Sequence, residues 1–286
     1  MSQNPYSKLH ATAEQRVAHL RSRGLQIARP NVAARKIEEI GYERLRIYFL
    51  SRRDHSQPGK PFRAGTTYND ILSLYDCDAR LRDICFKGVG RFELVFRNRL
   101  SEVLSENFGS HPYFADAAFK GIQKHNEALQ KVLEVFSKSK DQRAKHYRTT
   151  YTEPPIPPIW ILKEFLTFGT ATRLYTALST SLRTDIASHF GVSSLPVFES
   201  WLPCFVDLRN VCAHHDRLFN RRFQKQPQNY HRGAVPTASR ATLKAQLECL
   251  DFVLNNAGLR SRLVEDVKKV LDLDRYSEVQ CAEVGY

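Results

Sequence analysis

The sequence lacks the features of a membrane protein or of a disulfide-stabilised secreted protein. None of its six cysteines forms a Cys-x-x-Cys pair, and in a chain of 286 residues this is typical of reduced cytosolic thiols. No apolar run approaches the roughly 18 residues of a membrane span. The first residues, Met-Ser-Gln-Asn-Pro-Tyr, contain no apolar signal segment. We therefore expect a cytoplasmic protein.

Several familiar enzyme motifs are also missing. The sequence contains no Walker phosphate loop, no dinucleotide-binding fingerprint and no nucleophile elbow. These absences argue against a P-loop nucleoside triphosphatase, a dehydrogenase and a serine hydrolase. A zinc site is a further alternative, but its candidate ligands have no familiar zinc-binding spacing: Cys204, Cys212, His214 and His215. We expect no metal and no other cofactor.

Acidic residues are in deficit. The chain has 43 lysines and arginines against 30 aspartates and glutamates, a formal net charge of +13 and a pI near 9.6. This balance favours a polyanionic partner, bound by an attraction that salt would weaken. The alternative is a soluble protein that is basic but has no polyanionic partner.

Strand-like alternation is scarce and helical spacing dominates, so we expect an all-α fold. Thr12 and Gln15 form the pattern of a capping box. The spacing predicts one helix that Asn31 caps and that extends to about Tyr48, two runs within 68–108, one helix over 160–178 and another over 194–213. We expect a helical lobe over residues 1–60, a helical domain over 61–286, and a basic, proline-rich connector over 137–158.

Basic residues are concentrated just before the prolines of this connector and again after residue 220. We interpret them as RNA contacts, and the alternative for the first run is a solvated helix face or a loop. The candidates are Lys138, Lys140, Arg143, Lys145, Arg148, Arg221 and Arg222.

Residues 209–220 read Arg-Asn-Val-Cys-Ala-His-His-Asp-Arg-Leu-Phe-Asn, and their side chains suit phosphate chemistry. An arginine can hold phosphate oxygens through two parallel hydrogen bonds, and a histidine can move a proton near neutral pH. On an ideal helix His214 points about 140° away from Arg209. The two side chains therefore converge only if the helix ends or bends near Ala213, or if a two-fold axis joins two copies of the segment.

The chain resembles the Abi-like family of phage abortive-infection proteins, in its AbiD/AbiF group within the HEPN superfamily. The resemblance covers most of the chain. It is carried in chain order by Ile40, Gly41, Tyr42, Arg44, Leu45, Tyr48, Tyr75, Asp78, Leu81, Arg82, Glu93, Arg97, Pro158, Trp160, Phe168, Gly169, Arg209, Asn210, Cys212, Ala213, His214, His215, Arg217, Leu218, Asn220 and Arg221.

This resemblance implies a HEPN-like helical bundle and a metal-independent endoribonuclease with an Arg-x4-His motif. It implies Arg209, Asn210 and His214 as catalytic residues, with support from His215, Arg217 and Asn220. His215 also satisfies the looser spacing of such motifs, so the choice of histidine stays open. Because the chain has one motif, we expect a homodimer in the active form.

The expected partner is RNA, both as substrate and as a cognate small noncoding RNA of the kind encoded beside some members of the family. The alternatives are a protein of the same fold that binds a structured noncoding RNA without cutting it, and a regulatory module that binds only proteins.

Overall fold

The protein is built from α-helices. The computed structural model describes residues 9–273, and this part of the chain contains twelve α-helices, three short 3₁₀-helices and only isolated β-bridges. The expected all-α class is confirmed. The chain divides into two compact units, Met1–Arg80 and Leu81–Tyr286. The division into a lobe over 1–60 and a domain over 61–286 stays a prediction.

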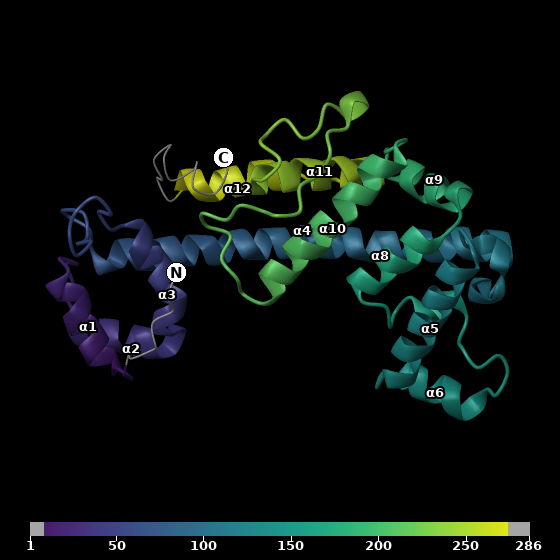
Figure 1. Cartoon of the computed structure of the whole chain (residues 1–286), viewed down its shortest axis with the longest axis horizontal. Helices are drawn as coiled ribbons and strands as arrows, with labels where there is room; N and C mark the ends of the chain where they lie inside the picture. Colours follow the sequence, from purple (N-terminus) through teal and green to yellow (C-terminus); the bar gives the residue numbers. More distant parts are fainter. Residues whose placement is uncertain (1–8, 274–286) are drawn as a thin grey trace, which may run out of the picture. The chain divides into compact units, whose positions relative to one another are not determined.

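Unit 1 contains three short helices and the beginning of a long one (Figure 1). They are α1 (Ala13–Ser22), α2 (Pro30–Ile40), α3 (Tyr42–Ser51) and α4 (Tyr68–Phe108). The predicted capping box is present, because the Thr12 hydroxyl accepts from the Gln15 amide while the Gln15 side chain accepts from the Thr12 amide.

The structure corrects the helix expected from Asn31 to Tyr48. It begins at Pro30, so Asn31 lies inside the helix and is not its cap, because the first helical position needs no backbone N–H and proline already has a helical φ. Gly41 then separates α2 from α3 with a φ of 92°, a conformation that side chains disfavour. The apolar spacing continues across the break, which is why periodicity alone suggested one helix.

Helix α4 is one continuous helix where the sequence suggested two runs. Its apolar positions form a single buried stripe, which in unit 1 includes Leu74 and in unit 2 includes Val89 and Phe96. Gly88 lies on this helix opposite Leu263, whose Cδ1 would come within 2.6 Å of an added Cβ. The glycine therefore permits a close approach that an alanine would block.

Unit 2 comprises the rest of α4 and the remaining helices. The α-helices are α5 (Ile122–Lys138), α6 (Gln142–Thr150), α7 (Ile159–Leu162), α8 (Phe168–Ala177), α9 (Thr180–His189), α10 (Leu195–Ala213), α11 (Leu243–Asn256) and α12 (Leu263–Leu273). The 3₁₀-helices are Pro112–Phe114, Asp116–Ala118 and His231–Gly233.

Two expectations for unit 2 need adjustment. The helix predicted over 160–178 is interrupted, because the Thr167 side chain accepts from the Thr170 amide and starts α8 afresh. The connector over 137–158 contains a helix, α6, capped by Asp141. The helix predicted over 194–213 is confirmed as α10.

Aromatic rings join α4, α8, α9 and α10 into one core. Phe92 packs against Phe205 with ring centroids 5.0 Å apart and against Phe190 at 5.1 Å. The cluster continues through Phe96, Phe168, Tyr175 and Phe198. This core fixes α10 against the middle of α4, and so it determines which α4 residues lie near the end of α10 (Figure 1).

Candidate active site

The end of α10 follows from its sequence. The apolar side chains of Val197, Trp201, Leu208 and Cys212 are buried on one face. After Ala213 the chain turns in a Schellman motif: the His215 amide donates to the Cys212 carbonyl at 3.1 Å and the Asp216 amide donates to the Val211 carbonyl at 2.9 Å. The helix therefore ends where the convergence argument required it to end.

His215 occupies the left-handed position of this motif, with a φ of 55°. Glycine is the usual residue there, and a residue with a Cβ costs on the order of 1 kcal/mol in such a conformation. His214 is the C-cap residue. Both histidines are exposed, and the His214 imidazole makes no hydrogen bond to any residue between 9 and 273.

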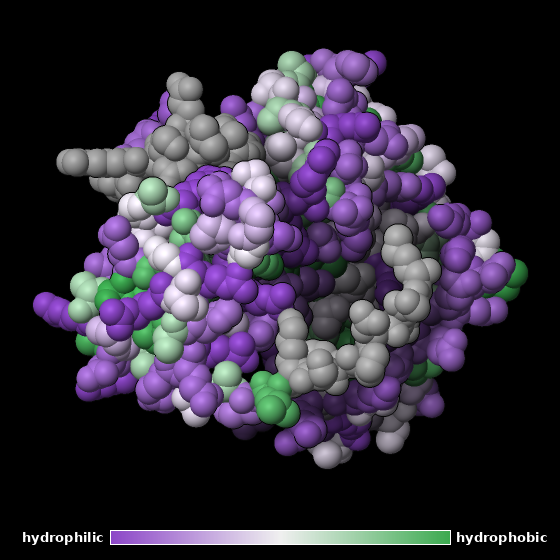
Figure 2. All heavy atoms as spheres, turned by 60° about the vertical axis from the view of Figure 1, so that its left-hand side comes forward, coloured by the Kyte–Doolittle hydropathy of each residue, from purple (hydrophilic) through white to green (hydrophobic). Residues whose placement is uncertain are grey.

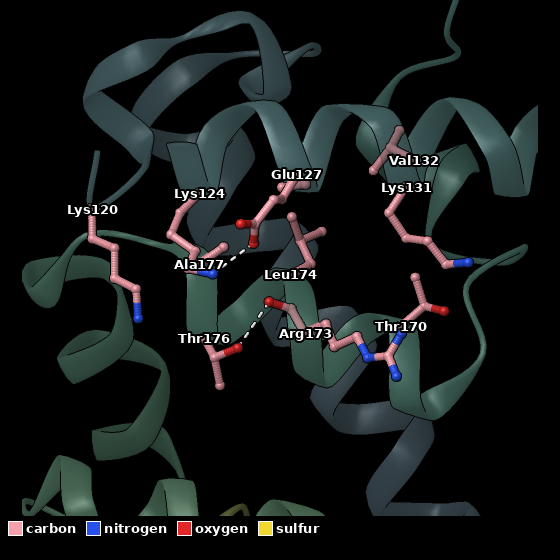
Figure 3. A pocket seen from close by; sticks show the side chains of 11 residues that line it. Lys120, Lys124, Glu127, Lys131, Val132, Thr170, Arg173, Leu174, Thr176 and Ala177 are labelled. Carbon is pink, nitrogen blue, oxygen red and sulfur yellow. Dashed lines mark hydrogen bonds and ion pairs between the residues drawn. The ribbon is translucent and has the colours of Figure 1, made fainter. Parts of the chain in front are cut away.

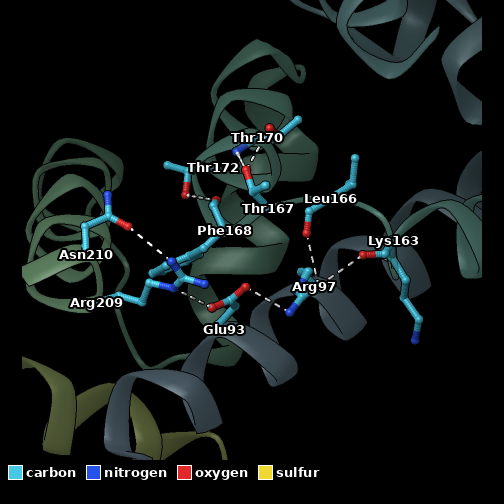
Figure 4. A network of polar contacts seen from close by, with 10 residues as sticks. All are labelled: Glu93, Arg97, Lys163, Leu166, Thr167, Phe168, Thr170, Thr172, Arg209 and Asn210. Carbon is cyan, nitrogen blue, oxygen red and sulfur yellow. Dashed lines mark hydrogen bonds and ion pairs between the residues drawn. The ribbon is translucent and has the colours of Figure 1, made fainter. Parts of the chain in front are cut away.

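Arg209 is held at the end of α10 by a carboxylate from α4. Its Nε lies 3.8 Å from Oε2 of Glu93, an ion-pair distance too long for a hydrogen bond. Its Nη1 donates weakly to Oδ1 of Asn210 at 3.4 Å. Figure 4 shows the Arg209 guanidinium between Glu93 and Asn210. Within the described residues Nη2 has no partner, so this edge is available to a ligand.

Glu93 is itself fixed by a second arginine one turn later on α4. Nη2 of Arg97 donates to Oε1 of Glu93 at 2.9 Å, and these two side chains are only 17% and 11% exposed. Nη1 of Arg97 donates to the carbonyl of Leu166 at 3.0 Å and more weakly to that of Lys163 (Figure 4). A buried carboxylate thus binds Arg97 directly and lies within ion-pair distance of Arg209.

An exposed aromatic ring lies beside the same arginine. The Arg209 guanidinium is 6.0 Å from the ring centroid of Phe86 on α4, and Phe86 is 45% exposed. A solvent-facing ring is a surface on which a nucleic-acid base can stack. The sequence analysis missed both Glu93 and Phe86 as site residues. The four-residue spacing of Glu93 and Arg97 was a signal for an ion pair, but nothing local connected that pair to Arg209.

The turn after α10 contains the supporting candidates Arg217 and Asn220 and the RNA-binding candidates Arg221 and Arg222. Nη1 of Arg217 donates to the carbonyls of Phe219 and Asn220 at 2.6 and 2.7 Å, so this side chain ties the turn together. Asn220 has a positive φ of 49°. The Arg221 guanidinium lies over the ring of Phe223 at 5.6 Å, and Arg222 is exposed.

The basic run near α6 carries less free charge than its sequence suggests. Lys131 and Lys138 bind Glu134 and lower the pKa of its carboxyl to about 2. Arg143 does the same for Asp141, again to about 2.

Three further residues complete this run. Arg148 donates to the carbonyls of Phe136 at 2.7 Å and Ser139 at 2.9 Å, which joins α6 to α5. Lys140 and Lys145 are exposed and have no ion pair among residues 9–273. Free positive charge in the run therefore resides mainly on these two lysines.

A second basic surface lies between α5 and α8, where the sequence analysis did not place one. A groove of about 410 Å³ is lined by four cationic side chains, Lys120, Lys124, Lys131 and Arg173, and by one acid, Glu127 (Figure 3). Lys124 pairs with Glu127 at 2.6 Å. The seven-residue spacing of Lys124 and Lys131 puts both on one helix face and was the signal available in the sequence.

The cysteines near the motif belong to the core. Cys204 and Cys212 are 1% and 5% exposed, and burial raises the pKa of the Cys204 thiol to about 12. Among residues 9–273 no three His, Cys, Asp or Glu side chains are grouped as metal ligands. Cys281 lies outside the described residues.

Comparison with known proteins identifies the family. The fold and the site define an all-α protein that carries an arginine and two histidines at the end of one helix. The family model described as Abi-like protein matches residues 35–220, which is more than half of the chain, and the chain belongs to this family. Neither the curated proteins nor the solved structures contain a match.

The surface agrees with the absence of long apolar runs in the sequence. No helix among the described residues has the length and apolarity needed to cross a bilayer. On the face drawn in Figure 2, hydrophilic residues predominate and hydrophobic ones occur in small groups. Family membership supports the expectation of an abortive-infection protein.

Proposed function

We propose that this Abi-like protein is a metal-independent endoribonuclease of the HEPN type that acts in abortive infection, with Arg209, Asn210 and His214 as its catalytic residues. One observation carries the proposal. The partly exposed Arg209 guanidinium lies within ion-pair distance of the buried Glu93, while Asn210 and His214 lie exposed on the same helix end.

These groups have the chemistry for cleavage by the RNA's own 2′-hydroxyl. The His214 imidazole takes the proton of the 2′-hydroxyl, whose oxygen attacks the adjacent phosphorus and displaces the 5′-oxygen. Arg209 donates to the phosphate oxygens, where negative charge accumulates in the transition state. Asn210 positions a phosphate oxygen or the imidazole. The products are a 2′,3′-cyclic phosphate and a 5′-hydroxyl.

Three features support RNA as the partner. The chain carries a formal charge of +13. The α5–α8 groove is lined by four cations, of which Lys124 and Lys131 are paired with glutamates while Lys120 and Arg173 have no ion pair among residues 9–273. The exposed ring of Phe86 beside Arg209 offers a stacking surface for a base. A small noncoding RNA is proposed as a second partner on the strength of the family resemblance.

The active form is proposed to be a homodimer. One motif supplies one arginine and one histidine, whereas the reaction needs one group to take a proton and another to give it. A two-fold axis near His214 would supply both from two copies of the chain.

The test is RNA cleavage in excess EDTA, with analysis of the product ends. Cleavage that persists and leaves a 2′,3′-cyclic phosphate supports the mechanism, while a strict need for magnesium or a 5′-phosphate end contradicts it. His214→Ala separates cutting from binding, because it should abolish cleavage and leave affinity unchanged. If wild-type protein binds RNA tightly and never cuts it, the non-cleaving alternative is correct.

A further inference from the structure

Unit 1 contains a pocket whose charges are not balanced. It has a volume of about 700 Å³ and opens between α1 and α3. Its lining includes one glutamate, Glu43, and the cationic or titratable side chains of Arg16, His19, Arg23, Arg46 and Arg53. No predicted site residue belongs to this pocket.

Three of the four arginines have only uncharged partners among the described residues. The Arg16 guanidinium lies 4.4 Å from the ring centroid of Tyr42, and Arg23 donates to the carbonyl of Gly59. Arg53 lies over the ring of Phe62 at 5.0 Å, and its buried Nε has no hydrogen-bond partner. Rings and carbonyls orient these cations but do not neutralise them.

The pKa values of two lining groups are lowered mainly by burial, and the neighbouring positive charges add to the shift. Burial lowers the pKa of His19, and Arg23, Arg53 and Arg16 lower it further. Burial also lowers the pKa of Arg53, with smaller contributions from Arg23 and Arg46 that the Tyr42 hydroxyl opposes. Positive groups repel one another in a partly buried space. An anion that enters this space offsets the repulsion and lowers the free energy.

The residue types select the kind of anion. Arginine presents a planar fork that matches phosphate oxygens through two hydrogen bonds, whereas lysine offers a point charge, and here the cations are arginines. The pocket volume falls in the range of small-ligand sites, roughly 300–1,000 Å³. The half-buried ring of Tyr42 also lines it and suits a base or ribose.

We propose that the α1–α3 pocket binds phosphate groups of an RNA strand and so gives unit 1 an RNA contact of its own. That the anion is RNA rests on the proposed function, while the affinity for phosphate rests on the pocket alone. An acidic protein would be recognised less well, because carboxylates on a folded surface do not repeat at the spacing of a phosphate backbone.

The experiment follows the His19 ring by NMR during a pH titration, with and without a single-stranded 2′-O-methyl oligoribonucleotide. The 2′-O-methyl group prevents cleavage through the 2′-oxygen. We expect the oligonucleotide to raise the pKa of His19, because phosphate offsets the neighbouring arginines. Arg16→Gln with Arg53→Gln should weaken binding several-fold and reduce the log–log salt slope by about 1.4, at ~0.7 per lost phosphate contact on a single strand.

The control is Arg21→Gln with Arg35→Gln, which removes the same charge from exposed positions of α1 and α2 outside the pocket. This pair should leave the His19 response intact. The proposal is overturned if saturating oligonucleotide leaves His19 unchanged, if inorganic phosphate shifts His19 but the oligonucleotide does not, or if polyglutamate shifts it equally.

The two proposals fail separately. Cleavage that persists in EDTA while His19 does not respond removes the α1–α3 site and leaves the nuclease. A His19 response in a protein that cuts no RNA removes the nuclease and leaves the site.

Discussion

Glu93 is the residue on which the geometry of the candidate active site most depends, and its replacement by glutamine gives a quantitative test. Glu93 is 8% exposed and lies between Arg97 at 2.9 Å and Arg209 at 3.8 Å. Glutamine keeps the shape of the side chain and one acceptor oxygen, but it removes the negative charge. Both arginines then lose their carboxylate partner.

The magnitude follows from the burial of the pair. Removing one member of a buried ion pair typically costs about 3–5 kcal/mol, because the other charge is left without compensation. Arg97 retains the carbonyls of Leu166 and Lys163, and the glutamine oxygen still accepts a hydrogen bond. We therefore expect a loss of about 2 kcal/mol in the free energy of unfolding. For a unit of this size, that corresponds to a fall of about 4–8 °C in Tm.

The assay is thermal and urea unfolding of the full chain followed by circular dichroism. The matched control is Glu127→Gln, which removes a glutamate that pairs with a lysine on exposed α5 and should leave the transition unchanged. A cycle with Arg97→Gln should show coupling, so that the double variant is less destabilised than the sum of the single variants. Equal melting of Glu93→Gln and wild type, or strictly additive effects, would refute the assignment of Glu93 as the link between the two arginines.

Five further outcomes are expected. Burial lowers the pKa of His19, His111 and His189 in the folded protein below 6.5. As the pH falls, these histidines therefore take up protons in the unfolded chain first. The free energy of unfolding decreases as the pH falls through 6.5. The urea midpoint should therefore be lower at pH 5.5 than at pH 7.5, and an equal or higher midpoint contradicts this. Gly191→Ala should cost about 1–3 kcal/mol, because its φ is 74° and the new Cβ would lie 2.8 Å from that of Asn256. Gly90→Ala in α4 meets no atom within 4 Å and should stabilise by up to ~1 kcal/mol in the same melts. Reversal of Lys138, Lys140, Arg143 and Lys145 to glutamate should weaken RNA binding more than Arg209→Ala in a filter-binding assay, and the opposite order makes that run a bystander. A mixture of Arg209→Ala and His214→Ala chains should stay inactive if both protomers must supply both residues, whereas full activity from a demonstrated monomer would remove the dimer argument.

Much of the fold was predictable because it is encoded locally. The capping box of Thr12 and Gln15 and the apolar stripe of α10 that ends at Ala213 involve residues within a few turns of one another. Errors arose where one residue overrode a continuous pattern. Gly41 separates two helices, and Thr167 starts a new one.

The sequence by itself determined that the chain is helical, basic and equipped with an arginine and two histidines at one helix end. Only the tertiary structure decided that Glu93 lies beside Arg209, and that Arg16, Arg23, Arg46 and Arg53 line one pocket. Hydrogen bonds and apolar periodicity within a helix depend on near neighbours, so they can be read along the chain. Contacts between helices depend on how buried rings such as Phe92 and Phe205 pack, and that packing brings together side chains whose sequence positions give no sign of each other.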